Sequence, residues 1–211
     1  EGGGRQLDLV DGPVYADEPS YRTTLVYGNI LVEHHEGNRQ MVHYGGDSGK
    51  PAGYRKGTLH FYNSTVVSWR PDRTTLLRLS SNEESADLRN NLVYAAAGGA
   101  TLEILARHGQ ATMRSNWLRQ GWHVCFGFTP FAGTMAGGET NLAGDQPGVV
   151  DGKGGDWRLR PDSPCRNQAA PLHPDIPEAH RVVRQWNGTG TWTERADGGA
   201  RHIGAFAPKE P

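Results

Sequence analysis

His43 is the residue in this chain best suited to acid–base chemistry, because its surroundings in the sequence are rich in proton donors and cations. An imidazole has an ordinary pKa close to neutrality and can accept or release a proton under physiological conditions. Lysine and tyrosine can donate protons, and arginine binds a carboxylate through two parallel hydrogen bonds. Such side chains follow His43 closely: Lys50, Tyr54, Arg55, Lys56 and Arg78. This set suits proton transfer on an anionic ligand.

A repeat of similar segments along the chain indicates which elements position these side chains. Asn29, Ser64, Asn91 and Asn116 form one polar column, at intervals that shorten along the chain. Apolar columns at a period of two flank it; they are Val26, Phe61, Leu88 and Met113 before it, and Leu31, Val66, Val93 and Leu118 after it. A second strand aligns as Val42, Leu77, Leu102 and Val124. Such columns are typical of stacked strands, in which each turn of chain buries its inner face against its neighbours.

The polar column has a physical reason of its own. A tight bend between two strands leaves backbone groups without partners inside the stack. Asparagine tolerates a left-handed backbone, and its side-chain amide offers both a donor and an acceptor. We therefore expect a ladder of side chains that hydrogen-bond from one turn of chain to the next, at a spacing of about 4.8 Å.

Composition limits the class of protein. The chain has 211 residues, a net charge of −1, 29 glycines and 13 prolines, which favours a loop-rich β domain and argues against nucleic-acid or membrane-surface partners. Every apolar stretch is far shorter than a membrane-spanning helix requires, so no membrane span is predicted. Cys125 and Cys165 lack metal-ligand spacing and are either one disulfide or two buried thiols.

Four segments carry a resemblance to a known family: GNILV (28–32), YNSTVV (62–67), RNNLVY (89–94) and SNWL (115–118). With the terminal segments DWRLRPDSPCRN and HIGAFA, they resemble the right-handed parallel β-helix of the pectate-lyase type. The resemblance implies an all-β solenoid of three-strand coils, closed by a C-terminal hairpin. It covers roughly residues 20–168, and its motifs are specific for the fold rather than for the reaction.

In that family the outer face of the first strand of each coil lines the substrate groove. First strands are expected at 39–45, 74–80, 100–106 and 123–128, second strands at 58–61, 86–90 and 111–114, and third strands at 65–68, 92–95 and 117–120. Alternation then places His43, Arg78, Glu103 and Cys125 in one outward column, and Met41, Leu76, Thr101 and His123 beside it. The structural alternative is that these residues are ordinary outward polar side chains, as on any solenoid. Opposite charges on neighbouring strands would then stabilise the fold modestly.

The resemblance implies a secreted, periplasmic or cell-surface polysaccharide lyase acting on a uronate-containing glycan. Catalytic roles are expected for His43, Tyr54, Lys50 and Arg55, and substrate binding for Arg78, Glu103, Arg39, Lys56, Arg70 and His123. A nearby guanidinium would lower the pKa of His43 and keep its imidazole neutral. Hydrolysis needs two carboxyls at a defined separation and is the weaker alternative. A non-catalytic glycan-binding or structural module is the other. The outward position of His43 predicts that His43→Ala folds normally.

No cofactor is expected from the sequence. The adjacent His34 and His35 point to opposite faces of an extended chain, so they are poor co-ligands of a metal. Asp47 alone cannot form a Ca²⁺ cage, although Ca²⁺ stays an open alternative.

The coils are expected over residues 1–168, with a Gly-rich loop insertion at 129–155. A Pro-rich linker and a closing hairpin, with Gly198–Gly199 in its turn, are expected over 169–211. Solenoids need a cap at each end, and the opening EGGGRQLDLVDG predicts only a strand. We therefore expect either that a second polypeptide covers the first coil or that the chain is the carboxyl-terminal part of a larger β-helix.

Overall fold

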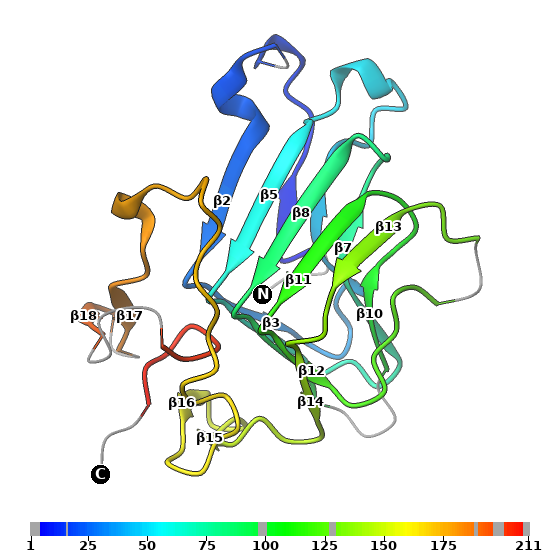
Figure 1. Cartoon of the computed structure of the whole chain (residues 1–211). Coiled ribbons are helices and arrows are strands. Elements are labelled where there is room, and N and C mark those ends of the chain that lie inside the picture. The colour runs from blue at the N-terminus through cyan, green and yellow to red at the C-terminus, as the bar shows by residue number, and fades with distance from the viewer. Residues whose placement is uncertain are drawn as a thin grey trace.

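A computed structural model describes residues 5–15, 17–96, 101–126, 130–187, 190–195 and 201–208. In this part of the chain the regular structure consists of strands and of 3₁₀ helices of three or four residues, so the all-β prediction is confirmed. Most strands lie in three parallel sheets. Figure 1 shows that these sheets surround a common interior.

Each of the three sheets collects strands that are distant in sequence. Sheet A contains β1 (Leu7–Leu9), β4 (Gln40–Tyr44), β7 (Arg73–Leu79) and β10 (Thr101–Leu105). Sheet B contains β2 (Thr23–Tyr27), β5 (Gly57–Tyr62), β8 (Glu84–Arg89), β11 (Gln110–Arg114) and β13 (Thr134–Gly137). Sheet C contains β3 (Ile30–Glu33), β6 (Thr65–Ser68), β9 (Leu92–Ala95), β12 (Trp117–Arg119) and β14 (Leu142–Gly144). From β1 to β12 the chain therefore visits sheets A, B and C in turn, and every third strand pairs in parallel.

Two antiparallel hairpins and four 3₁₀ helices complete the regular structure of the described residues. The hairpins are β15 (Val149–Asp151) with β16 (Asp156–Leu159), and β17 (Arg184–Trp186) with β18 (Trp192–Glu194). The helices are η1 (Pro13–Tyr15), η2 (Pro19–Arg22), η3 (Pro51–Gly53) and η4 (Glu178–His180). None of the described helices is long and apolar enough to cross a membrane.

The polar column forms the predicted ladder between sheets B and C. The backbone N–H of Ser64 donates to Asn91 Oδ1 at 3.0 Å, and that of Asn91 donates to Asn116 Oδ1 at 3.0 Å. The ladder continues to Asn141, whose Oδ1 accepts from the Asn116 amide at 3.0 Å. The left-handed residues lie one place earlier than expected, with φ of 65°, 46°, 58° and 50° at Gly28, Asn63, Asn90 and Ser115. The bend residue and the ladder residue are thus different neighbours.

The interior is filled by the inward faces of the three sheets. Val42 pairs with Leu77 in register, and both side chains are fully buried. The predicted partnership of Leu77 with Leu102 is wrong, because Leu77 lies opposite Leu105 and Leu102 lies opposite Thr74. Met41 and Leu76, predicted to stand beside the outward column, are buried in the main apolar cluster.

The region 129–155 is not the loop insertion that its glycine content predicts. Its strand β13 pairs in parallel with β11, and β14 pairs in parallel with β12, so these residues extend sheets B and C. The segment DWRLRPDSPC was expected as a last coil, but β16 within it pairs antiparallel with β15. The hairpin of β17 and β18 is a different one from the predicted closing hairpin, because both of its strands precede Gly198–Gly199, which lie outside the described residues. Cys125 and Cys165 are both free thiols.

Candidate active site

A continuous series of side-chain hydrogen bonds joins Asp8, His43 and Ser80 on the outer side of sheet A. His43 Nδ1 lies 2.8 Å from Asp8 Oδ1, and His43 Nε2 lies 2.8 Å from Ser80 Oγ. Asp8 on β1 is the register partner of His43 on β4, and Ser80 directly follows β7, the next strand of the sheet. Parallel pairing of three strands from different parts of the sequence therefore creates this arrangement, which we call the Asp8–His43–Ser80 relay.

The direction of the protons in the relay follows from the chemistry of its ends. An ionised carboxylate only accepts hydrogen bonds, so His43 Nδ1 carries the proton donated to Asp8. Nε2 of the neutral ring then accepts the hydroxyl proton of Ser80. Ser80 Oγ itself accepts the backbone N–H of Gly46 at 2.9 Å. Gly45 permits this close approach, because a Cβ at that position would lie 2.6 Å from Ser80 Oγ.

Exposure differs sharply along the relay. The His43 side chain is 0% exposed, whereas the side chain of Asp8 is 48% exposed and Ser80 is partly exposed. His43 was predicted on an open outer face. It does stand opposite Arg78, as expected, and also opposite Asp8, but it is fully covered, so the expectation of an exposed imidazole is wrong. Ser80, not His43, is the member of the pair that solvent reaches.

Charged side chains surround the buried imidazole. Asp47 Oδ2 lies 3.5 Å from His43 Nδ1, and Asp47 Oδ1 binds Arg78 Nη2 at 2.5 Å. Arg5 bridges the two carboxylates, at 3.4 Å from Asp8 and 3.5 Å from Asp47. Burial lowers the pKa of His43 below its ordinary value, and Arg78 lowers it further, while the hydrogen bond to Asp8 opposes both. The neutral imidazole that the sequence led us to expect is thus favoured chiefly by burial.

The pKa of His43 predicts how stability depends on pH. Because the folded-state pKa is lowered from 6.5, the folded chain binds this proton less readily than the unfolded chain. The contribution of the neutral His43 ring to the free energy of unfolding is complete above pH 6.5. It is lost as the pH falls through the folded-state pKa of His43. We expect the melting temperature to fall more steeply with decreasing pH in the wild type than in His43→Gln. Parallel pH profiles of the two proteins in thermal melts would contradict this.

Burial of the imidazole also changes the expectation that His43→Ala folds normally. Truncation leaves a cavity and removes the hydrogen bonds that His43 makes with Asp8 and Ser80. We now expect it to cost about 1–3 kcal/mol of unfolding free energy.

Of the other residues predicted to be catalytic, Tyr54 lies close to the relay. Its ring abuts Gly46, where an added Cβ would clash with Tyr54 Cδ1, and its hydroxyl accepts the N–H of Gly49. The Arg55 guanidinium lies over the Tyr21 ring at 4.1 Å from its centroid. Lys50 is exposed at the start of η3. The structure thus places Tyr54 against the glycine that contacts Ser80.

The residues predicted to bind substrate are not gathered around His43, with the exception of Arg78. Glu103 lies opposite Thr75 rather than Arg78, so the column that joined it to His43 is wrong. Its carboxylate accepts from the Thr75 hydroxyl and from the N–H of Phe126.

The remaining predicted cations have other surroundings. Lys56 pairs with Glu84 at 3.0 Å, and Arg70 pairs with Asp72 at 3.0 Å. Arg39 and His123 are exposed.

Asp8 and Ser80 were not predicted from the sequence as candidate site residues. A signal for Asp8 was present, because it precedes His43 by 35 residues, as Asn29 precedes Ser64 in the polar column. Extending the repeat upstream would have placed Asp8 beside His43. Ser80 closes the predicted strand 74–80, where a terminal serine has no distinguishing spacing.

Two cavities lined with aromatic residues lie elsewhere, with the β15–β16 hairpin as a shared wall. One has a volume of about 620 Å³ and is lined by Trp157, Trp186 and Phe206 with polar groups such as Arg158. The other has a volume of about 400 Å³ and is lined by Trp69 and Tyr94 with Lys153 and Arg160 among its polar groups. Polar residues and glycines make up much of both linings.

Comparisons with known proteins identify no relative, since no protein-family model, no curated protein and no solved structure matches the chain.

Proposed function

We propose that the three stacked sheets form a right-handed parallel β-helix of the pectate-lyase type. Two observations support this. Strands from β1 to β12 enter sheets A, B and C in strict rotation. The side-chain ladder from Asn29 to Asn141 lies at the bend between the second and third strands, where the sequence resemblance places it.

We further propose that the protein acts outside the cytoplasm, as a secreted, periplasmic or cell-surface protein, on a uronate-containing polysaccharide. The reaction is hydrolysis of an ester carried by that glycan. The observation that supports it is the Asp8–His43–Ser80 relay, in which a nucleophile, a base and an orienting carboxylate follow one another at 2.8 Å each. This is the arrangement by which a serine hydroxyl is activated.

The relay can carry both halves of ester hydrolysis. Ser80 Oγ attacks the ester carbonyl while its proton passes to His43 Nε2, and Asp8 stabilises the imidazolium. Collapse of the tetrahedral intermediate breaks the bond to the alcohol, which takes the proton back from His43. Water then hydrolyses the acyl-Ser80 by the same route. The Gly46 N–H donates to Ser80 Oγ at 2.9 Å and so helps to fix the position of the hydroxyl.

The contacts of the cations support ester hydrolysis better than the β-elimination that the resemblance implies. Elimination needs a cation to neutralise the substrate carboxylate. Arg78, Lys56 and Arg70 are each paired with a carboxylate of the protein. An ester has no charge at its reacting carbonyl and needs no such cation. The glycan as the substrate class rests on the sequence resemblance to the pectate-lyase type.

A covalent probe tests the proposal directly. A fluorophosphonate reacts with an activated serine, so we expect mass spectrometry of the digested protein to locate the adduct on Ser80. Acetylated and methyl-esterified uronate glycans should release acetate or methanol without the ultraviolet absorbance of a conjugated double bond. An absorbing product with Ser80 unlabelled would instead favour elimination. Glycan binding with neither product would favour the non-catalytic alternative.

A further inference from the structure

The outer face of sheet B is covered by the segment 169–180, which crosses the carboxyl ends of its strands (Figure 1). Ala170 and Asn90 exchange two hydrogen bonds, at 2.7 and 2.9 Å. The Pro171 carbonyl accepts from Arg89 Nη1 at 3.0 Å, and the His180 carbonyl accepts from the Tyr62 hydroxyl at 2.7 Å. These contacts hold the segment at both ends against the sheet. Residues 173–175, between the two anchors, therefore lie over β5 and β8.

His60 lies beneath this segment, and one of its ring nitrogens lacks a hydrogen-bond partner among the described residues. Leu59 and Phe61 of β5 point into the core, so His60 points outward, yet it is only 2% exposed. Its Nδ1 is buried and has no hydrogen-bond partner among the described residues. A buried polar atom without a hydrogen-bond partner is destabilising and requires an explanation, of which a bound ion is one.

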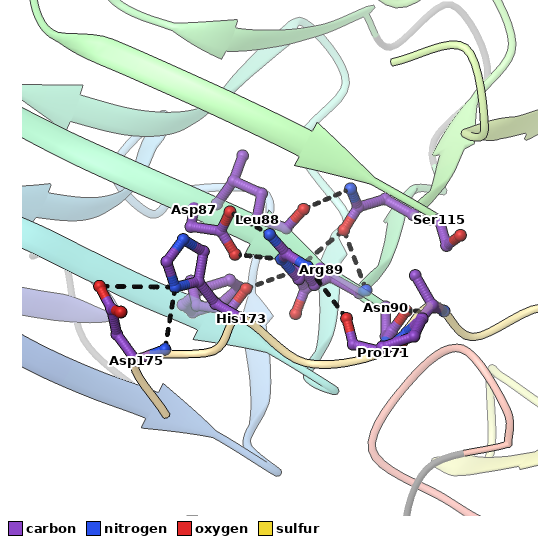
Figure 2. Close-up of polar contacts among 12 residues, drawn as sticks. Asp87, Leu88, Arg89, Asn90, Ser115, Pro171, His173 and Asp175 are labelled. Atoms are coloured by element: carbon purple, nitrogen blue, oxygen red, sulfur yellow. Dashed lines mark hydrogen bonds and ion pairs between the residues drawn. The ribbon is translucent and has the colours of Figure 1, made fainter. Parts of the chain in front are cut away.

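Two further ligand groups converge on the same place. One ligand atom from each of His60, His173 and Asp175 lies within 4.8 Å of the other two. The His60 and His173 rings have their centroids 5.0 Å apart. Figure 2 shows His173 and Asp175 in contact with each other, beside the Asp87–Arg89 ion pair of β8.

We propose that His60, His173 and Asp175 form a binding site for a divalent transition-metal ion of the zinc class. The three side chains are graded in burial, with His60 at the bottom, His173 partly exposed and Asp175 exposed at the rim. An ion can therefore enter from the Asp175 side and reach the orphaned imidazole.

The donor set determines which ions fit. Two imidazoles and one carboxylate suit zinc and neighbouring transition metals, whereas Ca²⁺ and Mg²⁺ prefer oxygen ligands alone. Ligand bonds to zinc are about 2.0–2.2 Å long, so ligand atoms on one ion lie about 3–4 Å apart. The present separations, all within 4.8 Å, need only a small closure of the three side chains.

The charges at the site are the carboxylate of Asp175 and the Asp87–Arg89 ion pair. Asp87 is the register partner of His60, but Arg89 binds both of its oxygens, at 2.5 and 3.1 Å. An ion bound between His60 and His173 would join segment 169–180 to sheet B, and so connect two parts of the chain that are distant in sequence.

Titration of tag-free, chelator-treated protein tests the site. We expect one Zn²⁺ to bind per chain by calorimetry, Co²⁺ to give the visible absorption of a protein-bound ion, and Ca²⁺ to bind far more weakly. Loss of an outer-shell partner alone costs about 10- to 100-fold in metal affinity. We therefore expect His60→Ala and His173→Ala each to weaken Zn²⁺ binding by more than about 100-fold.

Matched variants separate loss of the site from loss of the fold. Asp175 is exposed, so Asp175→Asn should fold normally and still weaken Zn²⁺ binding. His35→Ala removes an exposed histidine elsewhere and should leave the affinity unchanged. Absence of Zn²⁺ binding to the wild type would overturn the proposal. So would wild-type affinity in His173→Ala and Asp175→Asn.

Discussion

Ser80→Ala is expected to abolish ester hydrolysis while the protein stays folded. The substitution removes the one hydroxyl that His43 Nε2 contacts at 2.8 Å, and with it the nucleophile of the proposed reaction. Loss of a serine nucleophile in a relay of this kind reduces kcat by at least about 10³-fold, or about 4 kcal/mol of transition-state stabilisation. The measurement is the steady-state rate of acetate or methanol release, with circular dichroism to verify the fold.

Two further variants make this result specific. Ser48→Ala removes an exposed hydroxyl from the neighbouring loop and should leave the rate unchanged. Asp8→Asn should reduce kcat by about 10³- to 10⁴-fold, because an amide at this position can donate to Nδ1 and so leave the proton on Nε2. Ser80→Ala at the wild-type rate would contradict the proposed nucleophile. Equal losses in Ser80→Ala and Ser48→Ala would point to a general disturbance of the loop.

The parts of the fold that could be predicted from the sequence are those in which few residue types can perform the structural task. The ladder could be predicted because a buried bend needs a side chain that both donates and accepts, and few residue types do so. The region 129–155 could not be interpreted in the same way. Its strands, Thr134–Gly137 and Leu142–Gly144, are short and made largely of small residues, so they lack apolar alternation. Asn141 nevertheless follows Asn116 by 25 residues and belongs to the ladder.

The register of sheet A shows why part of the candidate site was misplaced. In β7 four consecutive residues, 74–77, are buried, so the strand has no strict alternation to fix its neighbour. Either register would place Leu102 opposite a buried residue, and a pattern of this kind specifies register weakly. Glu103 was therefore aligned with Arg78, three positions from its true level. His43 was placed at its correct level opposite Arg78, although four consecutive residues of β4, 41–44, are buried as well.

Burial of His43 and the meeting of His60 with His173 depend on segments whose paths the sequence does not reveal. His43 is covered because the chain turns back at Gly45 and Gly46 and brings Asp47 over the imidazole. His173 reaches sheet B because hydrogen bonds at Ala170 and His180 hold its segment there. Prolines at 171, 174 and 177 indicated a linker but not the surface against which it lies.

Asn91→Ala is expected to be among the most destabilising single substitutions in the described part of the chain. Asn91 is 1% exposed, and its side chain donates to the Phe61 carbonyl at 2.8 Å and to Asn116 Oδ1 at 3.0 Å. It also accepts the backbone N–H of Ser64 at 3.0 Å. Alanine removes these partners from the Phe61 carbonyl and the Ser64 N–H, at about 1–3 kcal/mol each, whereas Asn116 Oδ1 keeps the backbone N–H of residue 91. We therefore expect a loss of about 3–5 kcal/mol. That is a large fraction of the roughly 5–15 kcal/mol by which domains are stable.

Equilibrium unfolding in urea measures this loss, and the ladder supplies its own controls. Asn29→Ala should cost much less, because Asn29 is only partly buried and its amide donates to the nearby carbonyl of Tyr27. Asn91→Ser should lose less than Asn91→Ala, since Ser64 occupies the same column and its hydroxyl accepts from the N–H of Asn29. If Asn91→Ala cost no more than Asn29→Ala, the stack would be held together by its apolar interior alone, and the polar column would only shape the bend.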